Sequence, residues 1–173
     1  MATTFWWREL NGSSGSNTET TLTNINFGNS NSANLTPASY PIAAGNNSYT
    51  KYVIGIWSGD FTQINNVKFW KASGSLVTGE TIQMTGSIEF ATPSATDAGD
   101  PAVVTAQPAV ANVNIPWWQY EGATAWFAAG PGGVINGPGS GSTMPMRLQM
   151  LTTASSPAGP VNTKTFAITY DQQ

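Results

Sequence analysis

The sequence predicts an all-β chain: a single antiparallel β-sandwich, with a jelly roll as first choice and an immunoglobulin-like sandwich as second. Uncharged polar residues are abundant, because 22 Thr, 16 Ser and 15 Asn join 18 Gly and 11 Pro. Thr favours strands, and the other four favour turns. About eight short segments alternate apolar and polar residues, and helical periodicity is weak throughout. The length of 173 residues suits one domain.

The N-terminal segment differs from the rest of the chain. Three aromatic residues, Phe5, Trp6 and Trp7, precede a Gly- and Ser-rich run at 11–17 that is typical of a linker. We therefore predict a flexible N-terminal arm and linker at 1–17, followed by the β-sandwich domain at 18–173. The three aromatic side chains would either fold back onto their own domain or dock on a neighbouring subunit.

Five strands are predicted in the first half of the domain. Expected strands are 22–27, 49–57, 61–64, 67–71 and 81–91. Segment 49–57 has apolar residues on both faces, which predicts a central strand with one face in the core and the other covered. Asn65 and Asn66 tolerate left-handed backbone angles and fit a tight connection. Gly86 falls at an inward position and suggests a bulge or a close backbone approach.

The second half is less regular. Residues 92–102 have the composition of a loop, and two weak strands are expected at 103–104 and 113–115. Beyond the aromatic stretch at 117–120, the segment 123–129 is the one place where a short helix is plausible. A long Gly/Pro loop follows at 130–141. Two further strands, at 144–150 and 165–170, restore the alternation.

Composition excludes several classes of chemistry. The chain has no Cys and no His, which removes disulfides, thiolate zinc sites and Ser-His-Asp catalysis. The net charge is −3 and no cluster of Lys or Arg occurs, so we expect no nucleic-acid partner. No apolar run is long enough to span a membrane, and the N-terminus lacks signal-peptide features. We therefore expect a protein made in the cytoplasm, with no membrane partner.

Acidic residues are the remaining candidates for catalytic or metal-binding groups. A glycosidase needs two carboxyl groups about 5–9 Å apart, and the candidates are Glu80, Glu89, Glu121 and Asp60. Glu80 and Glu89 fit solvated surface positions, so we expect no enzyme and no catalytic residue.

A cation site is the other use for acidic residues. Asp97 and Asp100 lie three residues apart in a loop but lack the alternating ligands of an EF-hand. The Gly-rich stretch at 130–141 lacks the Lys-Ser/Thr ending of a phosphate loop. We therefore expect no metal and no cofactor.

Aromatic residues carry the strongest functional signal. The chain has 7 Trp, and Trp is a frequent anchor of protein interfaces. The expected partner interface consists of Phe5, Trp6, Trp7, Trp117, Trp118 and Trp126. Trp and Tyr rings can also stack on sugar rings, so a carbohydrate-binding β-sandwich module, for example on a phage tail or fibre, is the alternative.

Several segments resemble small virion proteins of tailed bacteriophages. They are NSYTKY at 47–52, GDFTQINNVKFWK at 59–71, LTTAS at 151–155 and KTFAITYD at 164–171. The most similar class is the capsid decoration or cement protein. This resemblance implies a non-catalytic role on the outer shell, the major capsid protein as partner, a homo-oligomer with a trimer favoured, and a virion location. It carries over no individual site residue. A weakly charged surface agrees with a protein that is covered in an assembly.

Overall fold

The computed structural model describes residues 3–86, 90–103, 105–107, 117–121, 125–129, 135–143, 145–157 and 163–173, with the backbone alone for 117–121 and 125–129. All regular structure in these ranges is β. The strands are β1 (Thr4–Ser13), β2 (Ser16–Thr21), β3 (Lys51–Gly59), β4 (Gln63–Ser73), β5 (Glu80–Gly86), β6 (Trp117–Glu121), β7 (Ala125–Ala129), β8 (Ile135–Asn136), β9 (Gly139–Thr143), β10 (Met146–Thr152) and β11 (Thr165–Gln172).

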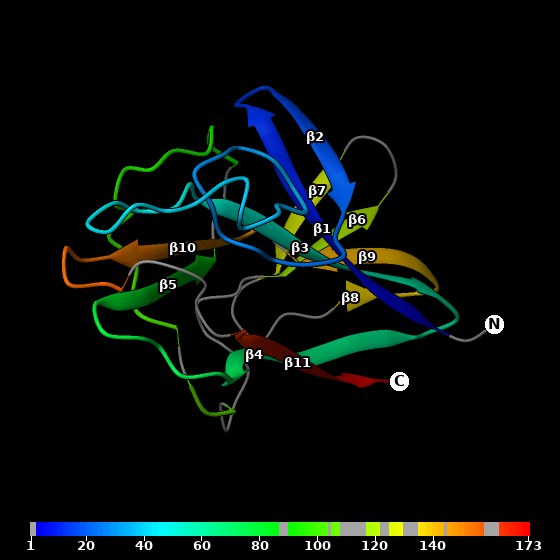
Figure 1. Ribbon diagram of the computed structural model, residues 1–173. Coiled ribbons are helices and arrows are strands. Elements are labelled where there is room, and N and C mark those ends of the chain that lie inside the picture. Colours follow the sequence, from blue (N-terminus) through cyan, green and yellow to red (C-terminus); the bar gives the residue numbers. More distant parts are fainter. Residues whose placement is uncertain are drawn as a thin grey trace.

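Two antiparallel sheets form the fold (Figure 1). The larger sheet has the order β2-β1-β3-β9-β6-β7, and the smaller has the order β11-β4-β8. Strand β3 is the branch point of the larger sheet. Along one edge it pairs with β1, and along the other it pairs first with β10 and then with β9. Strand β10 continues to β5, so the larger sheet divides into two wings beyond β3.

The hydrophobic core lies between the two sheets. Its fully buried members come from both sheets and include Val53 and Trp57 of β3, Ile64 and Phe69 of β4, and Leu148 of β10. Val53 and Trp57 follow the period of two that a strand imposes on its side chains, whereas in β4 the alternation is interrupted between Ile64 and Phe69, where Asn66 has a positive φ. The all-β class and the two-sheet sandwich are thereby confirmed. Jelly-roll and immunoglobulin-like connectivity stay as the two predicted alternatives within that class.

Strand β3 is covered on both faces, as its sequence predicts. Val53 and Trp57 point into the main core, and Tyr52 and Ile54 form a second buried cluster on the opposite face. Gly55 lies between them at a close approach, because a Cβ there would come within 2.9 Å of the Phe5 ring. The missing side chain lets the Phe5 and Trp7 rings approach the backbone of β3 closely.

The expectation of a flexible N-terminal arm is wrong. Strand β1 is hydrogen-bonded between β2 and β3, and Phe5 and Trp7 pack against the main core. The Gly/Ser-rich run is the tight turn of a β1–β2 hairpin, in which Gly12 and Gly15 adopt the positive φ angles of 96° and 82° that glycine allows. The expected boundary between residues 17 and 18 therefore falls inside β2.

Two other segments differ from the predicted strands. Segment 61–71 holds one long strand, β4, and not two strands joined at Asn65 and Asn66. Asn66 does adopt a positive φ of 49°, within the strand, where the pairing with β11 is irregular. Residues 22–27 form no strand, yet Leu22 and Phe27 still pack on the core.

The later aromatic and glycine-rich segments also differ from expectation. Residues 125–129, expected as a short helix, form β7 in a hairpin with β6. The expected Gly/Pro loop contains β8 and the start of β9. Val103 lies outside any strand, although its backbone N–H donates to the Ile82 carbonyl. The weak strand expected at 113–115 lies outside the described residues.

Candidate functional site

The three N-terminal aromatics divide between the two faces of the larger sheet. Phe5 and Trp7 face the core, where Phe5 contacts Trp57 at a ring-centroid distance of 4.9 Å. Trp6 lies on the opposite, outer face and is half-buried. It pairs across the strands with Ile56, and the Arg8 guanidinium lies 6.0 Å from its ring centroid. Trp6 is thus the member of this trio that does not pack on the main core.

Strand pairing extends the Trp6–Ile56 pair into a row of residues across the outer face. Ile56 of β3 pairs with Ser142 of β9, and Ser142 pairs with Trp118 of β6. Residues directly opposite one another in antiparallel strands share a face. Trp6, Ile56, Ser142 and Trp118 therefore occupy one row across four strands, which we call the outer row.

The same rule places the remaining expected interface residues. Tyr120, two residues after Trp118, is paired with Trp126 of β7, so position 126 shares the face of the outer row. Trp117 pairs with Thr143 and occupies the opposite face. Of the six expected interface positions, Trp6, Trp118 and Trp126 are thus brought to one face, whereas Phe5, Trp7 and Trp117 belong to the other.

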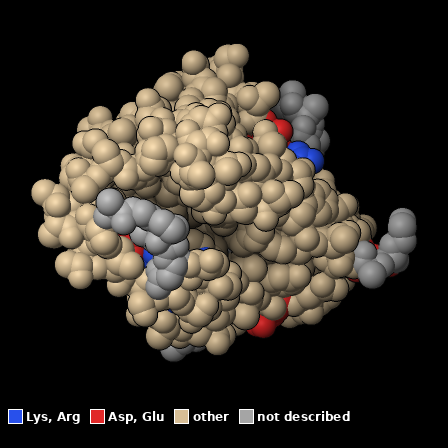
Figure 2. All heavy atoms as spheres, viewed as in Figure 1, with Lys and Arg blue, Asp and Glu red and all other residues tan. Residues whose placement is uncertain are grey.

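Eight of the 15 charged residues form ion pairs with one another within the described ranges. Four ion pairs join basic and acidic side chains in the part of the chain that the structure describes: Arg8–Glu19, Lys51–Glu9, Arg147–Asp100 and Lys164–Glu80. The view in Figure 2 accordingly shows a surface of almost entirely uncharged residues. This surface offers amides, hydroxyls and apolar groups to a partner, with few charges.

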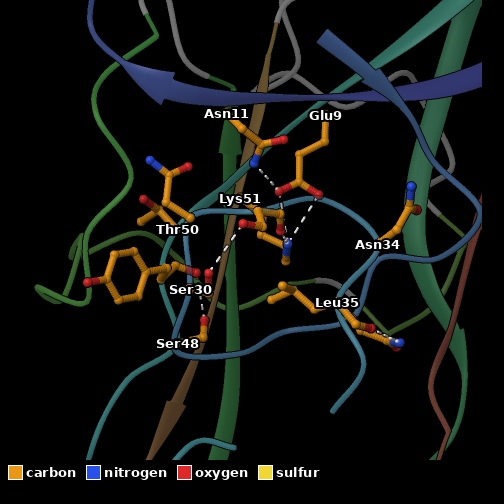
Figure 3. A network of polar contacts seen from close by, with 12 residues as sticks. Glu9, Asn11, Ser30, Asn34, Leu35, Ser48, Thr50 and Lys51 are labelled. Atoms are coloured by element: carbon orange, nitrogen blue, oxygen red, sulfur yellow. Dashed lines mark hydrogen bonds and ion pairs between the residues drawn. The ribbon is translucent and has the colours of Figure 1, made fainter. Parts of the chain in front are cut away.

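A buried polar group lies at the other end of β1, under the loop that precedes β3 (Figure 3). The Lys51 Nζ donates to both Glu9 carboxylate oxygens, at 2.9 and 3.1 Å, and to the Ser32 carbonyl at 3.0 Å. Asn11 Nδ2 donates to Glu9 Oε1 at 2.8 Å. Glu9, Lys51 and Asn11 are all buried, and Asn11 Oδ1 has no hydrogen-bond partner among the described residues.

This group is absent from the expected site residues because β1 was expected to be an arm. Within a strand, Glu9 and Asn11 alternate with Leu10 and share the inward face of Trp7. The sequence signal for Glu9 and Asn11 is that they follow Phe5 and Trp7 at every second position of one strand. Gly12 and Gly15 are the signal for the β1–β2 hairpin that makes this segment a strand.

Of the four candidate catalytic acids, Glu80 is engaged in an ion pair. Glu80, expected on the solvated surface, is buried. Its Oε2 lies 2.8 Å from the Lys164 Nζ and also accepts the Val77 N–H. The expectation of a solvated Glu80 is therefore wrong, because a turn at its N-terminal side directs it under the segment that leads into β11. Glu89 lies outside the described residues, and the side chain of Glu121 is not described.

The two loop aspartates are also engaged. Asp100 accepts two hydrogen bonds from Arg147, from Nε at 2.8 Å and from Nη2 at 2.6 Å. These hydrogen bonds raise the pKa of Arg147 further above its ordinary value. Asp97 Oδ1 accepts the Gly99 N–H. Within the described ranges, no cluster of three or more acidic side chains could hold a metal ion.

One further hollow lies beside the loop before β3. It has a volume of about 450 Å³ and is lined by uncharged residues, among them Asn29, Ile42 and Asn46. None of the described residues that line it is titratable, and Asn29, Asn46 and Asn47 offer hydrogen-bonding amides.

Comparisons with known proteins give no relative. No family model, no curated protein and no solved structure matches this chain. No membrane-spanning helix occurs among the described residues.

Proposed function

We propose that the protein is a non-catalytic structural component of a virion that binds the outside of the capsid shell and reinforces contacts between capsomers. The observation that carries this proposal is the outer row, in which half-buried Trp6 lies beside Ile56 and in register with Trp118. The partner in this proposal is the major capsid protein. The resemblance at 47–52, 59–71 and 164–171 supports the same role.

The physical basis of binding is burial of aromatic area on a surface with little charge. Burial contributes about 25 cal/mol per Å² of apolar area, before the cost of ordering is subtracted. Trp6 is half-buried between Ile56 of the neighbouring strand and the Arg8 guanidinium, so less side-chain freedom remains to be lost on docking. Many copies on one shell, arranged as the favoured trimers, would add avidity to a modest single-site affinity.

Co-sedimentation with capsid shells that lack the protein tests this proposal. The shells come from the virus that encodes the chain. We expect the wild-type protein to pellet with the shells and Trp6→Ala to remain in the supernatant. Leu76→Ala is the matched control, because Leu76 is a large exposed apolar residue outside the larger sheet. Failure of the wild type to pellet, or equal binding by Trp6→Ala, would contradict the proposal. Light scattering of the free protein tests the trimer.

Carbohydrate binding is the second candidate function. The strand register favours it, because positions 6, 118 and 126, all Trp, share one sheet face. Flat aromatic rings can stack on sugar rings. A glycan array distinguishes the two. Binding to defined glycans that Trp6→Ala abolishes would support this candidate, and an array without hits would remove it.

A further inference from the structure

We propose that the fold makes its own covalent cross-link, an amide bond between the side chains of Lys51 and Asn11, with Glu9 as the proton carrier. This inference is independent of the proposed capsid role. It rests on the buried polar group of β1 and β3 and concerns a modification within one chain.

Strand pairing brings the three side chains together. The β1–β3 register runs to the pair Leu10–Tyr52, so Asn11 and Lys51 are the next residues on their two strands. The Lys51 Nζ and the Asn11 Nδ2 both donate to the same oxygen, Glu9 Oε1, at 2.9 and 2.8 Å. An amine, a carboxamide and a carboxylate are thus held at one point, with the carboxylate in contact with both nitrogen atoms.

The surrounding structure keeps water out. Glu9 and Lys51 are each 1% exposed, and Asn11 is 7% exposed. The loop above them is fastened to β1 by Asn31, whose side chain accepts the Gly12 N–H and donates to the Gly12 carbonyl. Exclusion of water protects a reacting amide carbon from hydrolysis and fixes the groups in one arrangement.

The chemistry balances with these three side chains alone. Glu9 takes one proton from the Lys51 ammonium, which leaves a neutral amine. The Nζ lone pair then attacks the Asn11 Cγ and forms the new C–N bond. Glu9 returns its proton to Nδ2 and takes a second proton from Nζ. The Cγ–Nδ2 bond then breaks, its electron pair goes to nitrogen, and ammonia leaves. No oxidant or other reactant is required.

The arrangement favours the product. Two buried charges are costly even when they are paired, and the reaction removes both, since Lys51 becomes an amide nitrogen and Glu9 ends protonated. Asn11 Oδ1, which has no partner in the unlinked arrangement, becomes the carbonyl oxygen of the new bond. A protonated Glu9 is then a neutral hydrogen-bond donor beside it.

Trypsin digestion followed by mass spectrometry tests the proposal. No Lys or Arg lies between Glu9 and Lys51, or between Tyr52 and Lys68. Unlinked protein therefore gives the separate peptides 9–51 and 52–68. Linked protein resists cleavage at Lys51 and gives one peptide, 9–68, lighter than its sequence by the mass of one ammonia. Recovery of peptides 9–51 and 52–68 from folded protein would overturn the proposal, as would loss of water with Glu9 in the link.

Variants separate the three roles. Lys51→Arg keeps the positive charge and should abolish the mass loss, and Glu9→Gln should abolish it or slow it strongly. Asn11→Asp should lose the mass of water and give a product identical to the wild-type link. Asn17→Ala, a matched exposed Asn on the same hairpin, should leave the link intact. Circular dichroism checks the folding of each variant. A link that persists in Glu9→Gln would overturn the role of Glu9, and the wild-type digest decides the link itself even where a variant does not fold.

Discussion

Arg147 of β10 binds both carboxylate oxygens of Asp100, at 2.8 and 2.6 Å, and thereby fastens the loop at 92–102 to the outer side of the β5–β10 pair. We expect Asp100→Ala to lower the free energy of unfolding by about 1–3 kcal/mol, because two charge-assisted hydrogen bonds are lost. Urea denaturation measures the change. Asp97→Ala is the matched control and should change stability by less than about 0.5 kcal/mol; equal effects would contradict the assignment.

Gln149 holds the same loop from beneath. Its fully buried amide donates to the Ser48 and Thr96 carbonyls and accepts the Ala98 N–H. Gln149→Leu leaves three buried backbone groups without partners, each costing about 1–3 kcal/mol. We expect faster hydrogen exchange at the Ala98 amide, measured by NMR, together with lower stability. Unchanged exchange at Ala98 would show that the loop is held by other contacts.

The Glu80–Lys164 ion pair fastens the segment before β11 to β5. Both side chains are almost fully buried, with 1% and 5% exposed. We expect Lys164→Met to cost about 3–5 kcal/mol, because it leaves a buried carboxylate without its counter-charge. The double variant Glu80→Gln/Lys164→Met should recover most of that loss. A double-mutant cycle measured by thermal or urea denaturation checks the coupling, and simple additivity of the two changes would contradict it.

Neighbouring Trp6 and Trp7 should respond differently to truncation. Trp7 faces the core and contacts Phe69 at a ring-centroid distance of 5.8 Å, whereas Trp6 faces outward. We expect Trp7→Ala to lower the free energy of unfolding by about 2–4 kcal/mol and Trp6→Ala to have a much smaller effect. Urea denaturation of both variants measures the difference.

Deletion of residues 1–17 gives an independent test of β1. The deletion removes a strand that pairs on both edges, so it should abolish cooperative unfolding. A folded truncated protein would instead restore the picture of a flexible arm.

Period-two patterns were sufficient to predict much of the sandwich. Met146, Leu148 and Met150 share an inward face as expected, and Tyr52 to Trp57 form a strand covered on both sides. Strands that contain Gly or Asn are difficult to predict, because these residue types favour turns. Asn66 in β4 and Gly139 in β9 have positive φ angles, of 49° and 128°, yet both lie within paired strands.

The candidate site was predictable in part. The aromatic excess indicated a partner surface, but which Trp faces outward depends on strand register, which sequence alone did not establish for β1, β6 and β9. The buried group of Glu9, Asn11 and Lys51 joins residues about forty positions apart in sequence. The group becomes buried only when the loop at 28–50 folds over it. The alternation on β1 indicates that Glu9 and Asn11 face inward, but their contact with Lys51 has no local sequence signal.

The pairing of charges inside the chain has a consequence for how the protein meets its partners. Fields from paired charges nearly cancel beyond a few ångströms, and dissolved salt screens only the unpaired remainder. Encounter with a partner is then governed by diffusion and shape, at the rates of unsteered association. Only the unpaired charges and the net charge of −3 remain to be screened, so the association rate should depend weakly on ionic strength.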